Sequence, residues 1–162
     1  MFKIAMVTVA VAVTAGVLAP TAQAAHSKIQ FLAASGSIGC QLGTARDGSA
    51  YAWCTVNDHS WASAPSDVCP RANIPGATGE PSGESVQLAE GQGPCFGSVM
   101  SQLLFSGQNV LPTLGYGDRR SVGSITCAVE LAGVSCVDSA TGNFFQVSGD
   151  SYTLSQLTQS EA

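Results

Sequence analysis

The sequence predicts an all-β domain, a small antiparallel sandwich or barrel stapled by disulfides. Six cysteines and 18 glycines occur among the 162 residues. The run GSIGCQL at 36–42 is repeated in similar form as GSITCAV at 123–129. Each run is followed by an alternating segment with its own cysteine, at 51–57 and at 133–138. We therefore predict two cystine hairpins, which arose by duplication or are two independently similar hairpins.

The first 24 residues have the features of an export signal. The basic Lys3 precedes an apolar run at 4–18, and small residues precede a predicted cleavage site after Ala24. The apolar run is short for a membrane span, and no second one follows it. An uncleaved N-terminal anchor is the alternative. We expect residues 25–162 to form a single secreted domain, which diffuses freely or stays in the cell wall.

The charge of the predicted mature chain disfavours several partners. Removing Lys3 from the six basic residues leaves five against eleven acidic ones, a net charge of −6. An acidic surface repels nucleic-acid phosphates and anionic lipid headgroups. Apolar residues make up 45% of the chain, enough for a hydrophobic core. We expect a monomer with no nucleic-acid partner and no transmembrane segment after signal cleavage.

All six cysteines lie in the predicted mature chain, and an even number in an exported protein predicts three disulfides. A disulfide fits the spacing of about 4.5 Å between opposed residues at non-hydrogen-bonded positions of an antiparallel pair. A metal site is the alternative, but no two cysteines have the short spacing typical of zinc ligands. We expect no metal and no cofactor. The hairpin pattern selects three pairs: Cys40–Cys54, Cys69–Cys95 and Cys127–Cys136.

The N-terminal half begins with a strand predicted at 28–32, followed by the first hairpin. Asp47-Gly48 predicts the hairpin turn, because glycine readily takes a positive φ. The period of two places alternate residues of both strands on one face. These residues are Ile38, Cys40, Leu42, Ala52, Cys54 and Val56.

The segment 57–83 is predicted to be a long surface loop pinned by Cys69. It contains four prolines, which lack the donor that a central strand needs. A strand is predicted at 85–89. The run at 95–105 is predicted to be a strand with a bulge, with a short helix as the alternative. The segment 113–120 is predicted to be a glycine-rich polar loop.

The C-terminal half contains the second hairpin and two closing strands, predicted at 144–148 and 151–154. Several short strands separated by regular turn signals favour a sandwich or a small barrel. Residues of the second hairpin share a face if its strands pair directly. These residues are Ile125, Cys127, Val129, Val134 and Cys136.

Six short motifs follow a common pattern: SGSIGC at 35–40, CFG at 95–97, Tyr116-Gly117, GSITC at 123–127, GVSC at 133–136 and Thr141-Gly142. In these motifs the chain resembles a family of small six-cysteine exported proteins from mycobacteria and related actinobacteria. The resemblance implies export, three disulfides and no established activity. Members of that family often have an acidic residue where this chain has Ser98, and a histidine where it has Asn143.

Catalytic candidates are few, and we assign no catalytic residue. Asp58, His59 and Ser60 have the residue types of a hydrolase triad, but adjacent side chains rarely form one. His59 is the one histidine away from the predicted mature N-terminus, and therefore the one candidate base titrating near neutral pH. Paired carboxylates for glycoside cleavage need a separation of about 5–10 Å. The candidates for such a pair are Glu80, Glu84 and Glu90.

Aromatic residues give the best binding hypothesis, with Tyr51, Trp53 and Trp61 as candidates. Tyr51 and Trp53 lie on the strand face opposite the cysteine. If that face is open, they form a platform for sugar rings or a partner protein; if a second sheet covers it, they belong to the core. Arg119 and Arg120 can hold a carboxylate or phosphate, or simply occupy a surface turn.

These observations predict a non-enzymatic secreted or cell-envelope module that binds a protein or glycan ligand. With all cysteines paired, no thiol nucleophile remains. A small extracellular hydrolase that uses His59 or the glutamates is one alternative. A protease or lysozyme inhibitor that presents the 57–83 loop is another.

Overall fold

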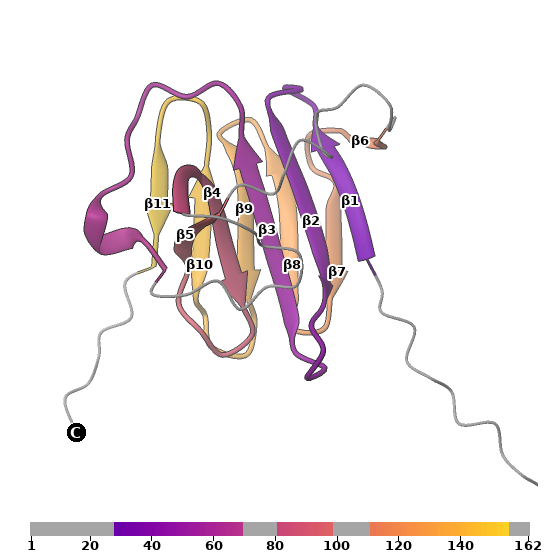
Figure 1. Cartoon of the computed structure of the whole chain (residues 1–162). Helices are drawn as coiled ribbons and strands as arrows, with labels where there is room; N and C mark the ends of the chain where they lie inside the picture. Colours follow the sequence, from indigo (N-terminus) through magenta and orange to yellow (C-terminus); the bar gives the residue numbers. More distant parts are fainter. Residues whose placement is uncertain (1–27, 70–80, 99–110, 156–162) are drawn as a thin grey trace, which may run out of the picture.

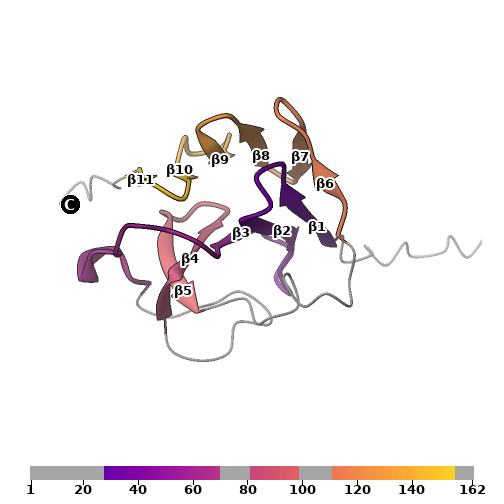
Figure 2. The ribbon, with the colours of Figure 1, turned by 90° about the horizontal axis from the view of Figure 1, so that it is seen from above.

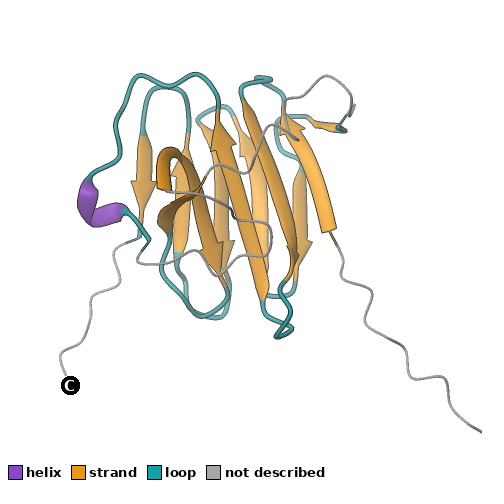
Figure 3. Ribbon diagram, in the orientation of Figure 1, coloured by secondary structure: helices purple, strands orange, loops and turns teal. Residues whose placement is uncertain are grey.

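The computed structural model describes residues 28–69, 81–98 and 111–155, and these residues form two β-sheets (Figure 3). Sheet A has the strand order β5-β4-β3-β2-β1-β6, and sheet B the order β11-β10-β9-β8-β7. The strands of sheet A are β1 (Lys28–Ala33), β2 (Ile38–Thr44), β3 (Ala50–Val56), β4 (Pro81–Ala89), β5 (Cys95–Ser98) and β6 (Thr113–Leu114). Those of sheet B are β7 (Arg119–Val122), β8 (Ile125–Glu130), β9 (Gly133–Asp138), β10 (Phe144–Val147) and β11 (Tyr152–Leu154). A single 3-10 turn, η1 (Pro65–Asp67), is the only helical element in the described ranges.

The two sheets stack face to face as the layers of a sandwich (Figures 1 and 2). Alternate residues of both sheets fill the space between them, as the period of two requires. The predicted all-β, disulfide-stapled class is therefore confirmed, and the sandwich alternative is the one observed. The core contains Phe31, Ile38, Cys40, Leu42, Cys54, Val56, Val86, Leu88, Ile125, Cys127, Val129, Val134, Cys136, Phe145 and Val147.

Each predicted hairpin carries its disulfide across one antiparallel pair. Cys40 lies opposite Cys54 in sheet A, and Cys127 lies opposite Cys136 in sheet B. The bonded pairs have Cα–Cα distances of 4.1 and 4.0 Å. These distances are close to the value of about 4.5 Å for a non-hydrogen-bonded pair. All four residues point into the core, so each hairpin is stapled on its buried face.

The third disulfide joins the long connection after β3 to the first residue of β5, through Cys69 and Cys95. All three predicted pairs are thus confirmed, and the described residues include no free cysteine. Three disulfides indicate an oxidising environment for the folded protein. Within the described ranges no helix has the length and apolar character needed to cross a membrane.

The connection after β3 is shorter than the predicted loop of residues 57–83. Strand β4 already begins at Pro81, and its pairing with β5 shifts register between Pro81 and Ser85. Proline lacks a backbone donor, but it is tolerated at the first residue of a strand. Within the described part of the connection, an isolated parallel bridge joins Val68 to Phe96 of β5.

The predicted loop at 113–120 is wrong at both ends, because it contains two short strands. Strand β6 pairs in parallel with β1, and β7 begins at Arg119. The turn between them is closed by Asp118, whose amide donates to the Gly115 carbonyl at 3.1 Å and whose Oδ2 accepts from the Gly115 amide at 2.9 Å. This turn carries the chain from sheet A to sheet B. In the predicted strand at 95–105, β5 ends at Ser98, and 99–105 lie outside the described residues.

A buried carboxylate joins the two sheets between the β4–β5 and β9–β10 turns, and these turns lie at the lower end of the ribbon in Figure 1. Asp138, at the end of β9, is fully buried. It accepts hydrogen bonds from the Gly91 amide at 2.9 Å, the Ala140 amide at 3.0 Å and the Thr141 hydroxyl at 2.9 Å. Burial alone would raise the pKa of Asp138, but these hydrogen bonds outweigh it and lower the pKa below its ordinary value. Because Gly91 belongs to the β4–β5 turn, the carboxylate ties sheet B to sheet A.

Asn143 strengthens the same junction. Its side-chain amide donates to the Gln92 carbonyl at 2.9 Å, and the side chain is almost fully buried. Asn143 therefore makes a structural contact between the β9–β10 and β4–β5 turns.

Candidate functional site

Five connections meet at the opposite end of the sandwich, which we call the loop end. Backbone hydrogen bonds join three of them to one another, because the Asn57 amide donates to the Ser37 carbonyl and the Ser60 amide to the Gly149 carbonyl. A fourth is fixed to β8, where the Gly117 amide donates to the Val129 carbonyl. Loops that a rigid sandwich holds together are a common place for binding sites. The connections are the β1–β2 turn (34–37), the segment after β3 (57–61), and the β6–β7 (115–118), β8–β9 (131–132) and β10–β11 (148–151) turns.

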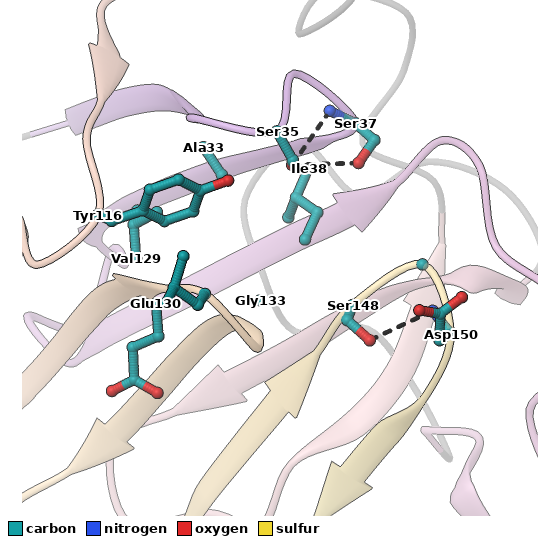
Figure 4. A pocket seen from close by; sticks show the side chains of 12 residues that line it. Ala33, Ser35, Ser37, Ile38, Tyr116, Val129, Glu130, Gly133, Ser148 and Asp150 are labelled. Carbon is teal, nitrogen blue, oxygen red and sulfur yellow. Dashed lines mark hydrogen bonds between the residues drawn. The ribbon is translucent and has the colours of Figure 1, made fainter.

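A pocket of about 170 Å³ opens at this end (Figure 4). Its lining includes Ile38 and Val129, which belong to the end of the hydrophobic core. Tyr116 and Leu131 also line it, and they are 56% and 88% exposed. Exposed large apolar side chains beside a concave site are typical of binding surfaces. The loop end therefore combines a pocket of mixed polar and apolar lining with two large, exposed side chains.

The turn that carries Tyr116 is held in place on both sides. Gly117 has a φ of 91°, a conformation that glycine adopts easily. The contacts of Asp118 with Gly115 close the turn, and the Gly117 amide binds the Val129 carbonyl at 2.8 Å. The backbone around the aromatic ring is thus fixed before any ligand arrives.

The pocket offers neutral hydroxyl groups and no cation. None of its lining residues, all within the described ranges, is lysine, arginine or histidine. The Glu130 carboxylate accepts from the Ser135 hydroxyl at 3.3 Å on the outer face of sheet B, and Figure 4 shows this side chain turned away from Ser35 and Ser37. The hydroxyls of Ser35 and Ser37 lie 3.1 Å apart at the rim, where Asp150 adds a carboxylate. The site therefore suits a neutral, hydroxyl-bearing ligand better than an anion.

An aromatic cluster lies next to the loop end and holds the segment after β3 against sheet B. The His59 and Trp61 rings stack with centroids 4.1 Å apart, and Tyr152 meets Trp61 edge-on at 5.0 Å. The Trp61 indole donates to the Ser148 carbonyl at 2.8 Å, and the Tyr152 hydroxyl donates to Asp67 at 3.0 Å. Trp61 is half-buried and serves here as an anchor of the chain.

The adjacent triad candidates are not assembled as a catalytic triad. His59 Nδ1 lies 2.7 Å from the Trp61 carbonyl, which only accepts, so this nitrogen carries the proton. A triad histidine would direct this nitrogen to a carboxylate. The Ser60 hydroxyl donates to the Gly149 carbonyl at 3.4 Å. These contacts position the chain rather than activate a nucleophile.

Two of the three candidate glutamates, Glu84 and Glu90, lie in the described residues, and they do not form a glycosidase pair. Glu84 and Glu90 are six residues apart along β4 and its end, which corresponds to about 20 Å at about 3.3 Å per residue. A catalytic pair needs about 5–10 Å. Glu90 instead accepts from the Ala50 amide at 2.9 Å and ties two turns together. Glu80 lies outside the described residues.

Of the two alternatives for Tyr51 and Trp53, the open face is excluded, because the two residues are 5% and 0% exposed. They lie on the outer face of sheet A rather than between the sheets. Burial raises the pKa of Tyr51, against the opposing effect of a 2.7 Å hydrogen bond from Gln41. The Trp53 indole nitrogen is buried without a partner among the described residues. Neither ring is available to a ligand.

The two arginines lie on an edge strand, not in the predicted glycine-rich loop. Arg119 and Arg120 are consecutive in β7 and exposed, and consecutive strand residues point to opposite faces. The Arg120 guanidinium donates to the Arg119 carbonyl at 2.7 Å. The pair therefore does not close around a single anion.

Sequence reasoning did not single out Leu131 and Tyr116 as site residues. Leu131 and Ala132 form the whole turn between β8 and β9, where asparagine, aspartate or glycine is usual. An apolar side chain in so tight a turn was the signal that could have indicated the site. The proximity of Leu131 to Tyr116 was not visible, because they belong to different turns.

No family model, characterised protein or solved structure matches this chain. The resemblance to the six-cysteine actinobacterial family therefore stays a prediction. The loop-end pocket, with Tyr116 beside it, is the best-supported candidate site.

Proposed function

We propose that this protein is an exported, non-enzymatic binding module whose ligand is a neutral glycan. The proposed site is the loop-end pocket, which would receive one sugar ring. The observation that carries the proposal is Tyr116, a 56% exposed aromatic residue on a fixed turn beside a pocket with a hydroxyl rim.

The size of the pocket supports a ligand group of one ring. A cavity of about 150 Å³ holds a benzene molecule, whereas sites for drug-sized ligands are about 300–1,000 Å³. At about 170 Å³, this pocket matches a single six-membered ring. Neighbouring sugars of the same glycan would lie outside, over the exposed Leu131.

The chemistry of the lining supports a sugar. An aromatic ring offers a broad apolar surface to the C–H face of a pyranose. The serine hydroxyls at the rim can donate to and accept from ligand hydroxyls. The lining has no cationic side chain, and the predicted mature chain carries a net charge of −6, which disfavours anionic ligands.

Export is supported by the signal-like N-terminus and by the three disulfides, which fit an oxidising compartment. The enzymatic alternative has less support, because His59 and Glu90 make structural contacts with backbone groups of different loops. The inhibitor alternative concerns a loop whose residues 70–80 lie outside the described ranges.

Glycan binding is tested by screening the purified protein against a glycan array and titrating each hit by calorimetry. Tyr116→Ala should weaken binding at least about tenfold, or about 1.4 kcal/mol. Phe144→Ala is the matched control, because it removes an aromatic residue that is 38% exposed on the outer face of sheet B, away from the pocket. Equal binding by Tyr116→Ala, or loss only with Phe144→Ala, would refute the pocket as the site. No binding to any glycan would refute the ligand class.

A further inference from the structure

The two hairpin disulfides touch one another across the core. Sγ of Cys54, in β3 of sheet A, lies 4.0 Å from Sγ of Cys136, in β9 of sheet B. All four cysteines of the two hairpins are 0% exposed. Four sulfur atoms from two sheets therefore form one buried cluster, separate from the loop-end pocket.

We propose that the two hairpin disulfides form one redox centre, in which reduction of either bond leads to an inter-sheet disulfide between Cys54 and Cys136. The observed form staples each sheet to itself. The rearranged form would staple the two sheets to each other. This inference is independent of the proposed glycan binding.

The rearrangement is balanced as two steps. An external dithiol first opens the Cys40–Cys54 bond to two thiols and closes to its own disulfide. The Cys54 thiolate then attacks Sγ of Cys136, the Cys127–Cys136 bond breaks, and Cys127 leaves as a thiolate and takes up the proton that Cys54 lost. The second step needs no oxidant or reductant. Initial reduction of the other hairpin gives the same product, by attack of Cys136 on Cys54.

Burial of the four sulfur atoms favours the attack of Cys54 on Cys136 over a reaction of Cys54 with a thiol or disulfide in solution. An external dithiol reaches the sulfurs during transient opening of the sandwich. After the core closes again, the Cys54 thiolate lies 4.0 Å from Sγ of Cys136 in the other sheet. A group held beside its target reacts as if at a very high local concentration.

The fold can accept the inter-sheet bond with a small movement. A disulfide bond is about 2.05 Å long, so the two sulfurs must approach by about 2 Å. Immunoglobulin sandwiches contain a buried inter-sheet disulfide between two packed sheets, which shows that the geometry is compatible with this architecture.

The first test uses the oxidised wild-type protein. It is incubated with limiting dithiothreitol for hours, since uncatalysed rearrangement takes minutes to hours, and free thiols are then trapped with N-ethylmaleimide. Trypsin and Glu-C cut after Arg46 and Glu130, which separates the two cysteines of each hairpin for mass spectrometry. We expect labels on Cys40 and Cys127 and a peptide that links Cys54 to Cys136. If N-ethylmaleimide labels both cysteines of one hairpin and the other hairpin keeps its disulfide, the proposal is overturned.

A second test uses two matched variants and oxidised glutathione as the oxidant. Cys40→Ser/Cys127→Ser retains the facing thiols, whereas Cys54→Ser/Cys136→Ser retains the other pair. The first variant should form its internal disulfide at least about tenfold faster than the second. Equal rates, or two free thiols in the first variant, would overturn the proposal. If either variant does not fold, the wild-type mapping decides alone.

Discussion

Asp138→Asn should destabilise the sandwich by about 2–4 kcal/mol. The carboxylate is fully buried and accepts three hydrogen bonds, two at Oδ2 and one at Oδ1. An asparagine has a single side-chain oxygen. In the position of Oδ2, this oxygen keeps the hydrogen bonds from Gly91 and Thr141. The NH₂ group then takes the position of Oδ1 and faces the Ala140 amide, which is also a donor. A buried donor without a partner costs about 1–3 kcal/mol. The two remaining bonds lose their charge assistance, while the smaller desolvation cost of a neutral amide offsets part of the loss.

The assay is urea denaturation of wild type and variant, repeated between pH 7 and pH 2. The pKa of Asp138 is lowered in the folded protein, so its stabilising contribution is complete above the unfolded pKa of about 3.9. The contribution is lost as the pH falls below that value through the folded pKa. The difference between wild type and Asp138→Asn should therefore be largest at pH 5–7 and shrink in acid.

Asp47→Asn is the control for this experiment. Asp47 lies in the β2–β3 turn and also accepts hydrogen bonds, from the side chain and amide of Ser49, which lower its pKa. It is exposed and joins no second sheet, so its replacement should change stability far less. A loss below about 0.5 kcal/mol in Asp138→Asn, or a loss that stays constant down to pH 2, would refute the role of this carboxylate.

Three further predictions concern other parts of the sandwich. Gly133→Ala should cost at least about 3 kcal/mol, because Gly133 has a φ of 120° and an added Cβ would collide with the Val147 carbonyl; a urea midpoint equal to wild type would contradict this. Burial raises the pKa of Tyr51, so its stabilising contribution is complete below about pH 10 and lost as the pH rises through the folded pKa. Unfolding at pH 8 and 11 should show a steeper alkaline loss in wild type than in Tyr51→Phe, and parallel losses would argue against it. Cys69→Ser/Cys95→Ser should lower the free energy of unfolding by about 3 kcal/mol, measured in guanidinium chloride, and an unchanged midpoint would show that this bond adds nothing.

The strands and the two hairpin cysteine pairs were predictable because they depend on local patterns. Alternation with period two put Cys40 and Cys54 on one face before any sheet was known, and the Asp47-Gly48 turn fixed their register. Errors arose where strands are very short. The two residues of β6 pair with β1, which is far away in the chain, and no local pattern indicates such a bridge.

The candidate site was much less predictable. The sequence allowed Tyr51 and Trp53 either an open face or the core, and the structure buries them on the outer face of sheet A. His59 and Trp61 do lie together, but their contacts anchor the chain. Alternation tells which residues share a face, whereas the exposure of that face depends on what packs on it.

The sequence by itself determined an all-β class and the two hairpin disulfides, because backbone dihedrals, side-chain alternation and turn geometry act over a few residues. The tertiary structure alone decided which sheet each strand joins, which faces are buried, and that Tyr116 and Leu131 share one pocket. It also brought Cys54 and Cys136 into contact. These properties depend on two sheets packing against each other, and such packing brings together residues that are remote in the chain.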